Sequence, residues 1–306
     1  MILAPSRGLK LIGTDCREIA QKRFAAMGLE IVFAPNTNDE NFDAACSWNA
    51  KARAADLMTA FADKSIKAIF TVLGGFNSNQ LLSLLDYDTI RNNPKIFCGF
   101  SDITALHGAI NAKTGLQTYY GPHYSSLGMK KGCEYTLEYL QKMLFSDEPV
   151  EVKPANEWSD DLWFIDQEKR EFIKNDGFWN IHNGKAEGTI IGGNLCTFNL
   201  LLGTDMRPAF AEDTILMIED DGGSSAAEFD RNLQALCYQP DFKNVKGLVI
   251  GRFQKESKMD RKTLEFIIKN KPELKNIHDD RRLPRRRRRA LQQGSLPLPA
   301  GLRPRP

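Results

Sequence analysis

Short apolar segments alternate with amphipathic helical segments along most of this chain of 306 residues. Such an alternation is typical of parallel βαβ units joined by right-handed crossovers, and it predicts an α/β fold. We expect strands over residues 1–5, 30–35, 68–73, 95–99, 117–121, 189–191, 214–219 and 245–253. We expect helices over residues 17–29, 50–63, 79–85, 102–113, 135–145, 195–202, 225–236 and 261–270.

The alternation is interrupted over residues 146–185, which are rich in Trp, Asp, Glu and Asn and show no clean period. We therefore predict an N-terminal nucleophile domain with a flavodoxin- or Rossmann-like parallel sheet (1–145), a connector with binding-loop potential (146–185) and a smaller C-terminal α/β domain (186–278). A tail follows over 279–306. The active site is expected between the two domains.

The tail differs in composition from everything before it. Residues 281–306 hold nine Arg and no Asp, Glu or Lys, so the remaining 280 residues carry 32 basic and 39 acidic groups, a balance of −7. The Arg run at 285–289 could be a patch for nucleic acid. We favour a segment of non-native origin, such as a shifted reading frame, because the composition changes at one point. Residues 1–280 show no excess of basic residues of the kind that binds nucleic acid.

The cysteine spacing and the apolar segments indicate in which cellular compartment the protein is expected. Six cysteines are scattered without CxxC spacing, which gives no support to a zinc site and fits free thiols in a reducing cytoplasm. We expect no signal peptide in the first residues, which lack a charged segment before a long apolar one, and no apolar run approaches the length of a membrane span. We expect a cytoplasmic protein, no metal, no cofactor, no membrane partner and a homodimer.

Ser101 lies in the most informative local pattern, Cys98-Gly-Phe-Ser-Asp-Ile-Thr104. A strand is expected to end at Gly99 and a helix to begin just after Ser101, which is how a nucleophile elbow presents its hydroxyl at a helix N-terminus. The backbone N–H of Asp102 would then be an oxyanion donor. Ile103 stands where the full G-x-S-x-G pattern has its last glycine, and Ser101 as an ordinary N-cap is the simpler local interpretation.

Two other strand ends carry candidate groups. Gly74 and Gly75 let backbone N–H groups approach a ligand oxygen, although a tight turn would also use such a pair. Glu219 ends the strand Ile215-Leu-Met-Ile-Glu219 and could orient a histidine, or lie in a solvated acidic turn. Among four histidines, only His123, after a strand end, is a plausible base in a cleft; His107 is expected inside a helix, His182 in a turn.

Taken together, several motifs resemble the LD-carboxypeptidase family of serine peptidases, and specifically its microcin C self-immunity branch. The likeness runs from about residue 4 to about residue 277. Asn-Ser-Asn after the glycine pair and the Gly-Lys-Ala-Glu-Gly stretch favour that branch over the muropeptide branch. The motifs are Gly74-Gly75-Phe-Asn-Ser-Asn79, Gly99-Phe-Ser-Asp-Ile-Thr-Ala-Leu106, Tyr120-Gly-Pro122, Asn183-Gly-Lys-Ala-Glu-Gly-Thr-Ile-Ile-Gly-Gly-Asn194, Ile218-Glu-Asp220 and Glu228-Phe-Asp-Arg-Asn-Leu-Gln234.

The resemblance implies a Ser–His–Glu triad in which Ser101 is the nucleophile and Glu219 orients the histidine. It also implies oxyanion donors at Asp102 and Gly75, with Gly74 and Trp163 in contact with substrate and Trp163 stacking on a nucleobase. The implied reaction cleaves an amide near a peptide C-terminus, and in the immunity branch the substrate is a peptidyl-nucleotide antibiotic.

One element of the family pattern is missing. The family histidine is expected in a Gly-His turn beyond a strand that begins at about residue 276, but this sequence has no Gly-His pair there. His278 would fall inside that strand, so we do not assign it the role. Two alternatives to the immunity-type hydrolase stay open: an LD-carboxypeptidase of cell-wall muropeptides, and a catalytically impaired protein that binds a peptide or peptidyl nucleotide.

Overall fold

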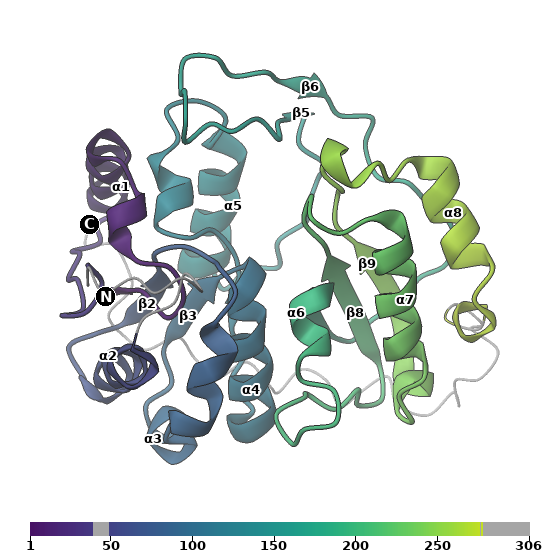
Figure 1. Ribbon diagram of the computed structural model, residues 1–306, viewed down its shortest axis with the longest axis horizontal. Coiled ribbons are helices and arrows are strands. Elements are labelled where there is room, and N and C mark those ends of the chain that lie inside the picture. The colour runs from purple at the N-terminus through teal and green to yellow at the C-terminus, as the bar shows by residue number, and fades with distance from the viewer. Residues whose placement is uncertain (39–48, 276, 278–306) are drawn as a thin grey trace.

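The computed structural model describes residues 1–38, 49–275 and 277. It confirms the α/β fold with two parallel sheets, and Figure 1 shows the two sheets in separate halves joined by a connector. The first sheet has the order β1-β2-β3-β4, and the second has the order β7-β8-β9. The strands of the first sheet are β1 (Ile2–Leu3), β2 (Ala68–Thr71), β3 (Ile96–Gly99) and β4 (Tyr119–Tyr120). The strands of the second sheet are β7 (Thr189–Asn194), β8 (Thr214–Glu219) and β9 (Val245–Ile250).

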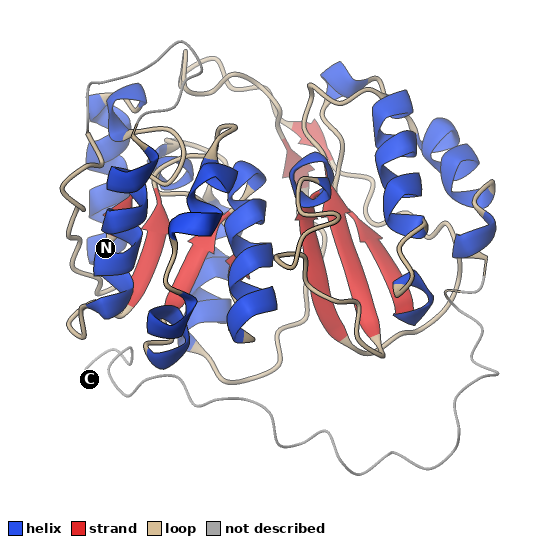
Figure 2. Ribbon diagram, turned by 60° about the horizontal axis from the view of Figure 1, so that its bottom comes forward, coloured by secondary structure: helices blue, strands red, loops and turns tan. Residues whose placement is uncertain are grey.

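Helices cover both faces of the first sheet (Figure 2). Neighbouring residues of one strand point to opposite faces, so Ile69 and Phe97 pack in one buried cluster while Phe70 and Cys98 pack in another. This is why the strands read as continuous apolar runs. The helices of this half are α1 (Thr14–Ala26), α2 (Ala50–Ala62), α3 (Tyr87–Asn92), α4 (Thr104–Thr114) and α5 (Glu134–Phe145).

The second half has its own core, in which Leu216 and Ile218 of β8 pack against Phe229 and Leu233 of the following helix. Ser225 caps that helix: its hydroxyl accepts the N–H of Glu228, whose carboxylate accepts the N–H of Ser225. The helices here are α6 (Leu195–Asn199), α7 (Ala226–Cys237) and α8 (Arg261–Lys269). Among the described helices of either half, none is long and apolar enough to cross a bilayer.

The structure corrects several expected elements. Residues 30–35 form no regular strand, because only Phe33 makes a bridge to Ile2 and Pro35 has no N–H for a further one. The helix expected over 79–85 is a 3-10 helix (Ser78–Leu84), and α3 was not expected. The connector contains a short antiparallel pair, β5 (Glu157–Trp158) and β6 (Ile173–Lys174). The expected tail and His278 lie outside the described residues.

Candidate active site

Ser101 lies between β3, which ends at Gly99, and α4, which begins at Thr104. Its φ of 60° falls in the left-handed region, which residues other than glycine rarely adopt and which occurs at strained functional turns. Thr104 supports the turn, since its hydroxyl donates to the Ser101 carbonyl at 2.7 Å. The backbone therefore makes a sharp strand–helix turn at Ser101, as the elbow interpretation expected.

Tyr120 connects this turn to the second domain. The Ser101 N–H donates to the Tyr120 hydroxyl oxygen at 2.9 Å, and that hydroxyl donates to Glu219 Oε1 at 2.5 Å. Burial, and then the nearby Glu219, raise the pKa of Tyr120, so the phenol keeps its proton at neutral pH. Burial also raises the pKa of Glu219, while the hydrogen bond from Tyr120 opposes that rise. The structure thus brings Ser101 and Glu219 to the same tyrosine.

The two domains approach each other closely beside this tyrosine. The Asn194 N–H donates to the Thr104 hydroxyl at 2.9 Å, which links the end of β7 to the start of α4. Gly193 has a φ of 134°, and a Cβ there would lie 2.7 Å from Thr104 Oγ1 and 2.9 Å from Tyr120 Cε2. Only a glycine fits this position, because both the backbone angle and the space exclude a side chain.

Asp102 holds three strand-end loops together. Its buried carboxylate accepts the Ser6 hydroxyl at 2.6 Å and the Ser78 N–H at 2.9 Å, and its carbonyl accepts the Ser78 hydroxyl at 2.6 Å. Gly75 lies in the loop between β2 and Ser78 with a φ of 154°, and a Cβ there would lie 2.3 Å from Ser6 Oγ. The network fixes the loop of Gly75 relative to the turn of Asp102, the two residues expected to donate to an oxyanion.

Gly74 leaves space in front of the Ser101 hydroxyl. A Cβ on Gly74 would lie 3.2 Å from Ser101 Oγ and 3.5 Å from His123 Nε2. The His123 ring stacks on Phe100 at 4.2 Å, its Nδ1 lies 2.7 Å from Thr71 Oγ1, and its Nε2 has no hydrogen-bond partner within the described part of the chain. Burial lowers the pKa of His123 to about 3, so the imidazole is neutral at physiological pH.

His107 does not complete a triad. Both ring nitrogens of His107 are engaged, Nδ1 with Thr118 Oγ1 at 2.8 Å and Nε2 with the Gly99 carbonyl at 2.9 Å. His182 lies in the connector. Neither His107 nor His123 has a hydrogen bond to Ser101 or Glu219 within residues 1–38, 49–275 and 277.

The tryptophans of the connector lie in two environments. Trp163, the expected nucleobase contact, is partly buried against the first-domain core, with its ring 6.0 Å from that of Phe164. Trp158 and Trp179 flank Arg252, whose guanidinium lies 4.8 Å and 6.0 Å from their ring centres. The contacts of Trp163 thus belong to packing, and they do not connect it to Ser101.

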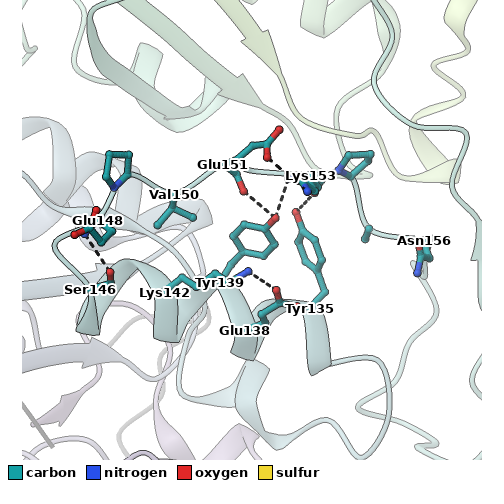
Figure 3. A pocket seen from close by; sticks show the side chains of 13 residues that line it. Tyr135, Glu138, Tyr139, Lys142, Ser146, Glu148, Val150, Glu151, Lys153 and Asn156 are labelled. Carbon is teal, nitrogen blue, oxygen red and sulfur yellow. Dashed lines mark hydrogen bonds and ion pairs between the residues drawn. The ribbon is translucent and has the colours of Figure 1, made fainter.

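Two cavities lie near the connector, and the second of them extends to Phe100, the residue before Ser101. One, of about 580 Å³, lies between α5 and residues 146–156; there the Tyr135 hydroxyl donates to the Lys153 carbonyl at 2.5 Å and the Tyr139 hydroxyl to the Glu151 carbonyl at 3.1 Å (Figure 3). These bonds fasten the connector to α5. A second cavity, of about 1070 Å³, includes Tyr120 in its lining. Neither is lined by Ser101 or Glu219.

Sequence reasoning missed several residues that shape the site. Tyr120 was noted only within the Tyr-Gly-Pro motif, and its place at a strand end was the available signal. Ser6 and Ser78, which bind Asp102, follow strands in the same way. Asn194 was likewise noted only within a motif, although it ends β7.

The fold and the site define a class: a two-domain α/β protein with a serine at a strained strand–helix turn and a carboxylate supplied by the second domain, as in serine hydrolases. Family profiles agree with that class. Residues 1–121 match the LD-carboxypeptidase N-terminal domain, and residues 187–280 match the LD-carboxypeptidase C-terminal domain. The chain belongs to the LD-carboxypeptidase family of serine-type carboxypeptidases.

Relatives connect the chain to the microcin immunity branch. YocD of Bacillus subtilis, a candidate carboxypeptidase, is 48% identical over 277 residues, which are 90% of this chain and 84% of YocD. The microcin C7 self-immunity protein MccF of Escherichia coli is 34% identical over 227 residues, 68% of this chain and 62% of that protein.

Solved structures show the same relationship. The crystal structure of an MccF-like protein from Bacillus anthracis superposes with a TM-score of 0.86 at 48% identity, covering 89% of this chain and 83% of that one. A structure of MccF in its wild-type apo state gives 0.77 at 29% identity, covering 88% and 83%. Other MccF structures contain glutamyl sulfamoyl guanosine or aspartyl sulfamoyl adenosine.

Proposed function

We propose that the site of this chain recognises a peptide or peptidyl nucleotide and is built to cleave an amide bond near its C-terminus. Ser101 is the nucleophile, Glu219 the carboxylate that orients a histidine, and the N–H groups of Asp102 and Gly75 the donors to the tetrahedral oxyanion. The Ser101 hydroxyl would attack the amide carbonyl, and the leaving amine would take a proton from the histidine before water releases the acyl group.

The two hydrogen bonds of the Tyr120 hydroxyl are the main support for this proposal. The hydroxyl accepts the Ser101 N–H and donates to Glu219, so the strained turn and the carboxylate are fixed to one group. If Glu219 were part of a solvated acidic turn, its carboxylate would be hydrated and would not be expected to accept a buried tyrosine hydroxyl. If Ser101 were an ordinary N-cap, its backbone would be expected in the extended region and not at a left-handed φ, and no second domain would be expected beside it.

For the substrate, we propose a peptidyl nucleotide. MccF structures contain glutamyl sulfamoyl guanosine and aspartyl sulfamoyl adenosine. The Asn-Ser-Asn motif after the glycine pair of this chain resembles that branch. Trp163 remains the proposed contact of the nucleobase, which requires it to leave part of its packing. A muropeptide is the alternative, favoured by the wider family.

We further propose that the chain, as its sequence stands, binds such a substrate with turnover near background. A serine hydroxyl needs a base, and the ideal base has a pKa near the working pH. His123 is the described histidine near Ser101, but its pKa of about 3 makes it a weak acceptor of the hydroxyl proton.

Binding and turnover measured together test these proposals. Isothermal titration with aspartyl sulfamoyl adenosine and with a muropeptide tetrapeptide should give a heat of binding for the nucleotide compound and a weaker one or none for the muropeptide. Mass spectrometry of a peptidyl-adenylate amide should show little product. The Ser101→Ala variant should bind as the unchanged chain does, and Ser83→Ala, an exposed serine, is the matched control. Preference for the muropeptide would overturn the substrate proposal.

A further inference from the structure

Arg7 is a cation beside the glycine pair that the triad does not use. It follows Ser6 in the loop after β1, and its backbone N–H donates to the Gly74 carbonyl at 3.2 Å. A Cβ on Gly75 would lie 3.0 Å from Arg7 Cγ. The side chain of Arg7 therefore runs along the same loop that carries the proposed oxyanion donor.

The guanidinium of Arg7 has no anionic partner within the described residues. Its Nε is shielded from solvent and has no hydrogen-bond acceptor there, and its Cζ lies 5.6 Å from the ring centre of Phe76. Phe76 is itself 71% exposed. A buried donor without an acceptor is costly in a folded protein, so such a group calls for a partner that binds later.

Arg7 and Ser101 lie beside the two neighbouring residues of the glycine pair. A Cβ on Gly74 would lie 3.2 Å from Ser101 Oγ, and a Cβ on the next residue, Gly75, would lie 3.0 Å from Arg7 Cγ. Adjacent Cα atoms are about 3.8 Å apart. A group bound by Arg7 would thus lie about one residue away from a carbonyl carbon attacked by Ser101.

We infer that Arg7 binds an oxyanion of the substrate next to the scissile amide, through Nε–H and one terminal N–H in a bidentate pair. Arginine matches the two oxygens of a carboxylate or of a phosphate in this way, while its flat face stacks on an aromatic ring. The carboxylate of a free peptide C-terminus and the phosphate of a nucleotide are the two sources of this chemistry. The inference rests on the proposed function, because it assumes that substrate binds at Ser101.

Paired ligands test the inference on the chain as it stands. N-acetyl-dialanine is compared with its C-terminal amide, and adenosine monophosphate with adenosine, by isothermal titration. The carboxylate pair identifies a peptide terminus as the source of the anion, and the phosphate pair identifies a nucleotide. The variant Arg7→Gln keeps the length of the side chain and loses the charge, and Lys22→Gln on the exposed face of α1 is the control with the same charge change.

Arg7→Gln should weaken binding of at least one anionic ligand roughly 10- to 100-fold, the usual range for a charged hydrogen bond, and leave its neutral partner unaffected. Lys22→Gln should change neither. In ¹⁵N NMR, the Arg7 Nε–H resonance should shift when the anionic ligand is added. Equal affinity of Arg7→Gln and the unchanged chain would overturn the inference and leave the proposed function standing. If the unchanged chain bound neither anionic ligand nor aspartyl sulfamoyl adenosine, the inference and the proposed function would both be wrong.

Discussion

The Tyr120 hydroxyl donates a 2.5 Å hydrogen bond to Glu219 although 99 positions separate the two residues. Tyr120 is the last residue of β4 and Glu219 the last residue of β8. The bond therefore joins the carboxyl ends of two separate parallel sheets, which is where open α/β sheets place their ligand sites. The relative position of the domains and the geometry of the site depend on the same contact.

Replacing Tyr120 with phenylalanine should remove this contact with little change of shape. Glu219 would keep its burial and lose a donor, and the Ser101 N–H would lose its acceptor. We expect the free energy of unfolding to fall by about 1–3 kcal/mol, as is usual when a buried polar group loses its partner. Urea denaturation measures this, with Tyr238→Phe, an exposed tyrosine, as the control. Equal stability of Tyr120→Phe and the unchanged chain would contradict the role of the contact.

Gly193→Ala should separate the two domains slightly and destabilise the chain. Its Cβ would lie within 3.0 Å of both Thr104 and Tyr120, at a φ that alanine rarely adopts. We expect a loss of roughly 2 kcal/mol or more in the free energy of unfolding, since strained backbone alone costs about 1–3 kcal/mol. Affinity for aspartyl sulfamoyl adenosine should fall as well.

Gly203→Ala is the matched control for backbone strain. Gly203 also has a positive φ, of 77°, but a Cβ there would meet nothing within 4 Å. The Gly203→Ala variant should destabilise the chain less than Gly193→Ala and leave the affinity for aspartyl sulfamoyl adenosine unchanged. If both variants lost the same stability and affinity, the close approach at Gly193 would not be the cause.

Stability should fall as the pH is lowered below the range where histidine titrates. Burial lowers the pKa of His107 to about 4 and that of His123 to about 3, from 6.5 in the unfolded chain. Between pH 6.5 and about 4 the unfolded state therefore binds protons that the folded state does not, so stability is full above pH 6.5 and is lost on acidification.

Each histidine should contribute a slope approaching about 1.4 kcal/mol per pH unit in this window. Urea denaturation at several pH values measures the slope. The variant His123→Asn should have a shallower slope than the unchanged chain, whatever its stability at neutral pH. A slope unaffected by His123→Asn would show that this histidine is not held neutral in the folded state.

Turnover by the chain as it stands should remain near background on a peptidyl-adenylate amide, because neither His107 nor His123 joins Ser101 to Glu219. Rates of about 1–10³ s⁻¹, usual for enzymes, would show that another group acts as the base. In a version supplied with the Gly-His turn of the family and shown to be active, Ser101→Ala should reduce turnover by a factor on the order of 10⁶. Retention of most of the rate would exclude Ser101 as the nucleophile.

The sequence determined the local elements and the class of fold. Continuous apolar runs predicted β2, β3 and β8 at nearly their observed positions, because strands buried within a parallel sheet need apolar residues. Residues 30–35 have a similar composition and form only one bridge, because a strand also depends on a partner that composition does not reveal. The strain at Ser101 could be anticipated from its place between a strand and a helix.

What the sequence left undecided is how the strand ends meet. Local patterns could not distinguish an N-cap from a nucleophile at Ser101, or a solvated turn from a catalytic carboxylate at Glu219. Tertiary structure decided that both contact Tyr120, that Asp102 binds Ser6 and Ser78, and that Gly193 lies against Thr104. The contacts of Tyr120 with Glu219 and of Gly193 with Thr104 form only once two independently packed sheets are placed side by side. The contacts of Asp102 form within the first half, where strand ends that are far apart in the chain come together, so all these distances come from packing rather than from any local pattern.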